Sequence, residues 1–191
     1  MTVYSIAVFL HIVGALGLFA AFGLEWAGLL SIRRAATASQ AREGFRLLGA
    51  TRVVGAPSAL TILITGLYLA LSAPWGRQAW IGLGLVGLVL IAVLGATLTG
   101  RRVRSMARAL PAEGASIPPA FGVRLRDPVL VLSALLRTAL ALGIVFIMAT
   151  KPSDAEALTA LGVALVLGAA AAAVVGGGNR HEVEGHRGRA S

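Results

Sequence analysis

The stretch VLVLSALLRTALALGIVFIMA, residues 129–149, decides the fold class of this chain. It is long enough to cross a bilayer, because a hydrocarbon core of about 30 Å needs about 20 apolar residues in a helix. Its one charged residue is Arg137. A guanidinium at that depth costs about 2.5–3.5 kcal/mol on insertion scales unless it finds a partner, water or the membrane surface. We therefore expect Arg137 to have an intramembrane partner.

The rest of the chain has the composition of a polytopic membrane protein. Of its 191 residues 57% are hydrophobic and 13% are charged, and the mean hydropathy is +0.84. Soluble domains carry about 25% charged residues, so about half of the usual solvating charge is missing. The chain has no cysteine, which excludes disulfides, thiolate metal sites and cysteine nucleophiles.

Five apolar segments are long enough to be transmembrane helices: residues 3–32, 53–71, 79–99, 129–149 and 157–175. The first lacks a basic leader region, so we expect it to stay in the protein as a span. The fold class predicted is an all-α integral membrane bundle of five transmembrane helices over residues 1–176. Residues 177–191 are polar and begin with glycines, which predicts a disordered, basic cytoplasmic tail.

The basic residues between the spans predict the orientation. Segments 33–52 and 100–127 and the tail together carry fourteen Lys and Arg, whereas the other two connections carry only Arg77 and Lys151. Basic segments stay in the cytoplasm and face anionic lipid, which puts the N-terminus outside and the C-terminus inside. This placement of the net charge of +9 also argues against nucleic-acid binding. We predict a multi-pass protein of the bacterial inner (plasma) membrane.

Small residues mark where helices approach closely in lipid. They recur every seven residues in the first span and every four in the fifth: Ala7, Gly14, Ala21 and Gly28, and Ala160, Ala164, Gly168, Ala172 and Gly176. Either stripe can pack within one chain or form a dimer, and we favour packing within the chain. A homodimer or a larger membrane complex remains an expected partner.

The second span carries a stripe of hydroxyl groups, which includes Ser58, Thr61 and Thr65. Such hydroxyls bond across helices or back to their own backbone carbonyls, and less often they line a polar cavity. Near its cytoplasmic end the same helix contains Pro57, which removes one backbone hydrogen bond and predicts a kink.

An intramembrane polar cluster is the main functional hypothesis. At 1.5 Å per residue, Glu25 and Arg137 lie at similar depths from the cytoplasmic boundary. Ser58 and Thr61 fall in the same layer, and His11 and Thr65 lie nearer the middle of the membrane. We predict that Glu25 and Arg137 form an ion pair joining the first and fourth spans, with Ser58 and Thr61 completing its hydrogen bonds. The pair either fixes helix packing or binds a proton or an anion; the remaining alternative is that Glu25 extends to the membrane surface without pairing.

His11 is the one residue in the spans that suggests a cofactor. The other histidines, His181 and His186, are in the tail, so a bis-histidine haem is not expected and only a single-ligand haem at His11 stays open. We predict no cofactor, no metal site and no catalytic residues. The chain contains no Walker loop, zinc-protease motif or recognisable Ser/His/acid signature.

Several short motifs resemble an uncharacterised family of small bacterial integral membrane proteins, domain of unknown function 2269. They are FLHIVGALGLF with its His11, the Arg-rich first loop, TGLYLA at 65–70, APWGRQAWI at 73–81 and VFIMATKP at 145–152. The resemblance covers about residues 1–152 and implies no assigned activity. More distantly, the first-span histidine resembles membrane bundles of the copper-resistance D type and of the haem-associated protoporphyrinogen oxidase type. The latter would also need a Lys on a later helix, and no predicted span here contains one.

These observations favour a non-enzymatic membrane protein, either an accessory subunit or a module that handles a small molecule or an ion. The alternative is a haem- or quinone-linked redox protein built around His11.

Overall fold

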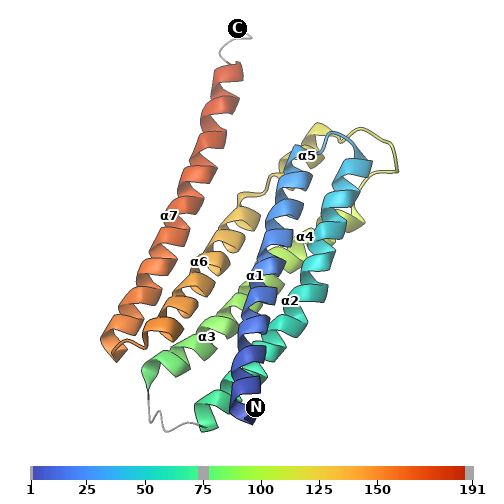
Figure 1. Ribbon diagram of the computed structural model, residues 1–191. Coiled ribbons are helices and arrows are strands. Elements are labelled where there is room, and N and C mark those ends of the chain that lie inside the picture. Colours follow the sequence, from blue (N-terminus) through green and yellow to red (C-terminus); the bar gives the residue numbers. More distant parts are fainter. Residues whose placement is uncertain (1, 73–77, 188–191) are drawn as a thin grey trace.

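The computed structural model describes the backbone of residues 2–72 and 78–187, and the side chains of these residues as far as Val175. The elements are α1 (Val3–Arg34), α2 (Ala38–Ser72), α3 (Ala79–Leu94), the π-helix η1 (Gly95–Gly100), α4 (Arg101–Arg108), α5 (Pro119–Leu125), α6 (Pro128–Thr150) and α7 (Asp154–Arg187). Five helical stretches are long and apolar enough to cross a membrane: Val3–Arg34, Ala38–Ser72, Ala79–Arg108, Pro119–Thr150 and Asp154–Val175. The predicted all-α bundle of five membrane-spanning helices is confirmed (Figure 1).

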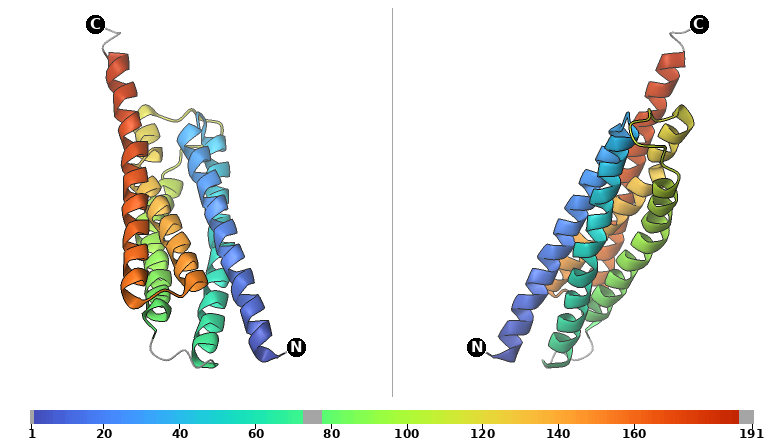
Figure 2. Two further views of the ribbon diagram at one scale, coloured as in Figure 1. Left: turned by 60° about the vertical axis from the view of Figure 1, so that its left-hand side comes forward. Right: turned by 90° about the vertical axis from the view of Figure 1, so that its right-hand side faces the viewer.

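The helices divide into two groups. α1 and α2 form a long antiparallel hairpin, and α6 packs against α7, α3 and η1. Between the two groups α1 approaches α6 most closely, and these backbone approaches are sparser than those within each group. Apolar side chains of both groups nevertheless pack together in two clusters, one around Phe22 and Leu140 and one around Leu29 and Leu130. The left view of Figure 2 shows the hairpin beside the second group.

The segment predicted as the Arg-rich first loop is helical, so the prediction of a loop over residues 33–52 is wrong. Only three residues separate α1 from α2, and α2 then continues from Ala38 through Pro57 to Ser72. The segment is helical because it has an apolar stripe of its own, which lies between the arginines in the sequence. Ala38, Ala41, Gly44 and Leu48 recur at helical spacing and are buried.

Local signals explain the ends of α6, the most buried of the spans. Asp127 caps its N-terminus by accepting a hydrogen bond from the Val129 backbone N–H at 2.9 Å, and Pro128 occupies the first turn. The helix ends at Lys151, whose φ of 48° is left-handed and whose N–H bonds to the Ile147 carbonyl.

The small-residue stripes pack within the chain, as favoured from the sequence. All four members of the α1 stripe are buried, and α1 has its most extensive contacts with α2. In α7, Gly168 and Ala164 meet the face of α6 that contains Ala139 and Gly143. Gly176 lies outside the described side chains.

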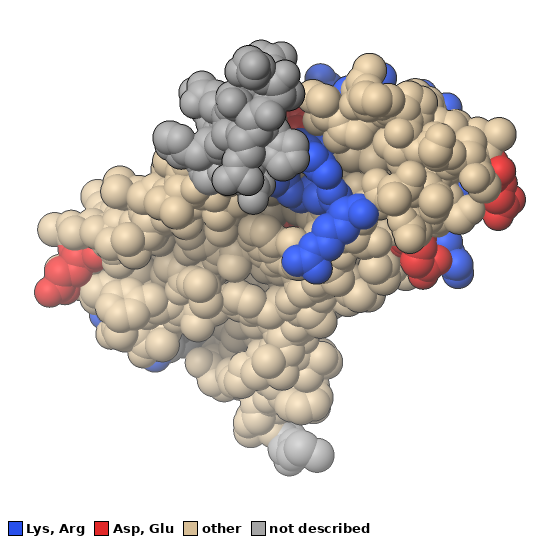
Figure 3. Space-filling model, turned by 90° about the horizontal axis from the view of Figure 1, so that it is seen from above, with Lys and Arg blue, Asp and Glu red and all other residues tan. Residues whose placement is uncertain are grey.

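Most of the basic residues gather at one end of the bundle, where α1, α4 and α5 end and α2 and α6 begin. Figure 3 looks onto this end. Beneath the charges lies an apolar cluster to which Leu29, Met106, Phe121 and Leu125 contribute. α4 extends the third span at this end, and α5 is a further short helix in the connection between α4 and α6. α7 as described includes most of 177–191, and the disorder predicted there stays a prediction because those side chains are not described.

Candidate functional site: a buried ion pair between two helix groups

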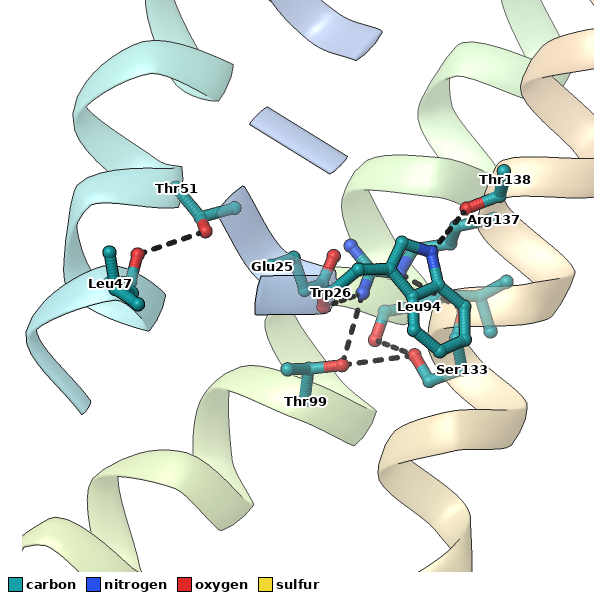
Figure 4. A network of polar contacts seen from close by, with 9 residues as sticks. All are labelled: Glu25, Trp26, Leu47, Thr51, Leu94, Thr99, Ser133, Arg137 and Thr138. Carbon is teal, nitrogen blue, oxygen red and sulfur yellow. Dashed lines mark hydrogen bonds and ion pairs between the residues drawn. The ribbon is translucent and has the colours of Figure 1, made fainter. Parts of the chain in front are cut away.

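The predicted ion pair is present. The Arg137 Nη2 on α6 donates to the Glu25 Oε1 on α1, and the two residues are 6% and 2% exposed. It is the one ion pair with both side chains buried in the described part of the chain. The pair joins the first and fourth spans and lies at the contact between the two helix groups (Figure 4).

Arg137 has further partners on its own side of that contact. Its Nη2 also donates to the Thr99 hydroxyl of η1 at 3.2 Å, and its Nε donates to the Ser133 carbonyl of α6 at 3.2 Å. The hydroxyls of Thr99 and Ser133 are bonded to each other at 3.1 Å, and both residues are buried. The guanidinium carbon also lies 5.9 Å from the centre of the Phe22 ring, a cation–π distance.

The network therefore holds its two charges unequally. The Arg137 guanidinium is held by hydrogen bonds to Thr99 of η1 and to Ser133 of α6. The Glu25 carboxylate, in contrast, accepts its hydrogen bond from Arg137 itself. One more bond crosses the same contact, from the Trp26 indole N–H to the Thr138 hydroxyl at 3.4 Å. No buried side-chain nitrogen or oxygen among the described residues lacks a hydrogen-bond partner. Complete pairing is what makes buried charges tolerable in an apolar medium.

Gly95 makes room for the guanidinium. A Cβ on this residue would lie 2.9 Å from the Arg137 Nη1, inside the van der Waals contact distance. Gly95 is also the first residue of η1, the six-residue π-helix that carries Thr99. π-turns are rare, and they are frequent at functional sites.

We expect Gly95→Ala to destabilise the protein by about 1–2 kcal/mol, because the new methyl group must displace the guanidinium from its partners. Gly82→Ala in the same span is the matched control, since a Cβ there meets nothing within 4 Å. That control gains about 0.5–1 kcal/mol from helix propensity alone. Thermal unfolding in mild detergent measures both. Equal stability of the two variants would contradict a tight fit at Gly95.

Ser58 and Thr61 do not complete the ion pair, which corrects that part of the hypothesis. The Ser58 hydroxyl donates back to the Val54 carbonyl at 2.8 Å, and a Cβ on Gly14 would lie 3.1 Å from the Ser58 carbonyl oxygen. The error comes from register. Because α2 begins at Ala38, the residues of α2 beside Glu25 precede Ser58 by about two turns.

His11 and Thr65 form a second, separate polar contact. The His11 Nδ1 lies 3.1 Å from the Thr65 hydroxyl, which itself donates to the Thr61 carbonyl. His11 precedes Glu25 by fourteen residues, which is about 20 Å along a helix. The predicted cluster is thus two sites, Glu25 with Arg137 and His11 with Thr65.

The residues missed from the sequence are Thr99, Ser133 and Gly95. Ser133 carried a usable signal, because it precedes Arg137 by four residues and so shares its helix face. Thr99 and Gly95 carried none, since their role depends on a π-helix and on how α3 packs against α6.

Comparison with known families gives one match. The family described as "Predicted integral membrane protein (DUF2269)" matches residues 5–152, which includes both charges of the ion pair, both residues of the His11 contact and all of α6. No curated protein and no solved structure matches the chain. The more distant resemblance to copper-resistance D-type bundles has no support from these comparisons. The chain, a multi-pass integral membrane protein of unknown activity, belongs to the DUF2269 family.

Proposed function

We propose that the protein is a non-enzymatic, ion-handling module of the membrane and that the Glu25–Arg137 pair is its working site. The observation that carries this proposal is the position of the pair. Its carboxylate belongs to the α1–α2 hairpin and its guanidinium to the α3–α6–α7 group. In the described part of the chain it is the buried ion pair that joins them, and it lies among apolar side chains that both groups contribute. Ionisable side chains within a membrane commonly mark ion pathways and proton relays.

The unequal anchoring supports a specific division of roles. Arginine stays protonated, and Arg137 keeps its bonds to Thr99 and Ser133 without help from Glu25. Glu25 can take up a proton at its carboxylate, which removes the attraction that joins the groups. An anion arriving at Arg137 would have the same effect by replacing the carboxylate. Either event removes the charge–charge contact between the groups, while Arg137 stays bound to Thr99 and Ser133.

We further propose that the protein lies in the inner (plasma) membrane of a bacterium with its basic end in the cytoplasm. The support is the gathering of arginines at one end of the bundle, which is the pattern of cytoplasmic segments. Five spans are few for a transporter, so we propose that a second copy or a larger complex completes the module. No observation on the described residues favours a haem or quinone at His11, so we propose none.

Reconstitution tests ion handling directly. In phosphatidylcholine vesicles with a trapped pH dye, the wild-type protein is expected to dissipate an imposed pH gradient faster than protein-free vesicles. Glu25→Gln and Arg137→Gln are each expected to lower that rate at least tenfold, since either change removes one charge of the site. The rate is read at equal protein per vesicle, after far-UV circular dichroism has shown equal helix content.

The matched control is the exposed pair Glu43 and Arg46, whose side chains are 60% and 80% exposed. The double variant Glu43→Gln, Arg46→Gln removes the same charges and is expected to leave the rate unchanged. A wild-type rate equal to that of empty vesicles, for chloride as well as for protons, would reject ion handling. The accessory-subunit reading then predicts stoichiometric co-purification with another membrane protein from native membranes.

A further inference from the structure

At the basic end of the bundle, one face of α4 borders an open hollow of about 450 Å³. The residues that line it are Arg101, Arg104, Ser105, Arg108 and Ala109. Their spacing of three and four residues puts the three guanidinium groups and one hydroxyl on the same side of the helix. All five residues are exposed.

A fourth arginine from another helix joins this face. A Cβ on Gly100 would lie 2.7 Å from the Arg52 Nη2 of α2 and 3.6 Å from the Arg104 Nη1 of α4. The two guanidinium groups therefore approach each other to within about 6 Å, a distance at which like charges repel. We call Arg52, Arg101, Arg104 and Arg108 the α4 arginine cluster.

The cluster differs from the other basic residues at this end, many of which have a partner. Arg102 pairs with Asp127 at 2.9 Å, and Arg33 and Arg126 each donate to the other's backbone carbonyl. None of the four arginines of the cluster forms an ion pair with a carboxylate in the described part of the chain. Three arginines that line a hollow, with Arg52 next to Arg104, are a site for a multiply charged anion.

The position of the cluster indicates which anion. α4 is the end of the third membrane-crossing stretch, Ala79–Arg108, and directly follows its apolar part, α3 and η1. Its arginines therefore lie at the level where lipid phosphates meet the hydrocarbon core. The same span exposes Val86, Val89 and Val93, which offer an apolar surface for acyl chains. Guanidinium groups bind phosphate oxygens through paired hydrogen bonds.

We propose that the α4 arginine cluster binds the phosphate of an anionic phospholipid headgroup, with the acyl chains of that lipid along α3. A soluble phosphate compound carries the same phosphoryl group as a lipid headgroup. The position of the cluster at the end of a span favours the lipid. This exposed site is distinct from the buried Glu25–Arg137 pair, although Gly100, beside Arg52 and Arg104, directly follows Thr99 of that network.

The test measures the affinity of the purified full-length protein for phosphatidylglycerol and phosphatidylcholine in mixed detergent micelles. The wild type is expected to prefer phosphatidylglycerol at least tenfold. The triple variant Arg101→Gln, Arg104→Gln, Arg108→Gln is expected to lose that preference. The matched control Arg34→Gln, Arg46→Gln, Arg124→Gln removes the same charge at the same end and is expected to keep it within twofold. If the triple variant does not fold, Arg104→Gln alone is expected to weaken the preference about fivefold, since one interfacial arginine contributes about that factor.

Two results would overturn the proposal. The first is a control that loses as much preference as the cluster variant, since the attraction is then a diffuse surface charge. The second is a cluster variant, well folded, that binds phosphatidylglycerol as the wild type does. Competition with sodium pyrophosphate distinguishes a lipid phosphate from a soluble one. If millimolar pyrophosphate does not displace phosphatidylglycerol, the cluster is a lipid site. If pyrophosphate displaces the lipid and binds more tightly than it, the cluster binds a soluble ligand instead. Vesicles of pure phosphatidylcholine test ion handling without this lipid, so the two proposals fail separately.

Discussion

Glu25→Ala is expected to destabilise the protein by about 3–5 kcal/mol, more than any substitution of its partner Arg137 by an apolar residue. The variant leaves a guanidinium 6% exposed and without a counter-charge, and arginine does not lose its proton. Thr99 and the Ser133 carbonyl still accept its hydrogen bonds, but neither carries a charge. The free energy of unfolding in mild detergent, or the loss of Tm, measures the effect.

Arg137→Met is expected to cost less, about 1–3 kcal/mol. The carboxylate left behind can take up a proton and become neutral, so the remaining cost is that of a buried polar group with poor hydrogen bonding. Adding Arg137→Met to Glu25→Ala removes the stranded cation, so the double variant should be more stable than Glu25→Ala alone. A double variant no better than Glu25→Ala would contradict the pairing.

Charge reversal tests the same pair from the other side. Glu25→Arg and Arg137→Glu each place two like charges at one buried contact, so both are expected to lower expression and Tm strongly. The combined swap should recover part of that loss. Recovery stays incomplete, because an arginine on α1 does not reproduce the bonds that Arg137 makes to Thr99 and Ser133. A swap as unstable as either single change would reject the pairing.

The pair itself was predictable from the sequence because it follows from energetics. Two opposite charges in separate apolar runs are each too costly to bury alone, so their association needs no knowledge of side-chain packing. The five spans were likewise predictable, because they follow from the length and hydropathy of the apolar segments. Both arguments depend on quantities that a linear sequence contains.

The surroundings of the pair were not predictable in the same way. The hydrogen-bond partners depend on the register of α2 along α1. That register is set by a turn of only three residues after Arg34, which could not be recognised in a connection so rich in arginine. That turn shifts α2 along α1, takes Ser58 away from Glu25 and leaves Thr99 and Ser133 as the partners of Arg137. Long-range packing, and not helix propensity, determines which hydroxyl groups lie within hydrogen-bond distance of the Arg137 guanidinium.

Close packing of α1 against α2 gives the second large expected effect. A Cβ on Gly28 would lie 2.8 Å from the Leu48 Cγ and 3.0 Å from the Gly44 carbonyl oxygen. A Cβ on Gly44 would in turn lie 3.0 Å from the Ile32 backbone nitrogen. Backbone atoms of the opposite helix cannot rotate away as a flexible side chain does, so any larger residue must separate the helices.

We therefore expect Gly28→Leu and Gly44→Leu each to destabilise the protein by about 3 kcal/mol or more. Gly23→Leu and Gly49→Leu are matched controls on the same two helices, because a Cβ at either position meets nothing within 4 Å. These controls should be neutral or slightly stabilising, since leucine is the better helix former. Thermal unfolding in detergent distinguishes the two sets, and similar Tm values for all four variants would contradict the close contact.

The same substitution should also disable the ion pair, because Gly28 is less than one turn from Glu25. Moving α1 away from α2 at Gly28 reorients the carboxylate relative to a guanidinium that η1 and α6 hold in place. Gly28→Leu is thus expected to lower the vesicle rate as Glu25→Gln does, whereas Gly23→Leu, on the free face of the same helix, leaves it intact. A Gly28→Leu protein that keeps the wild-type rate would show that the position of the hairpin does not control the pair.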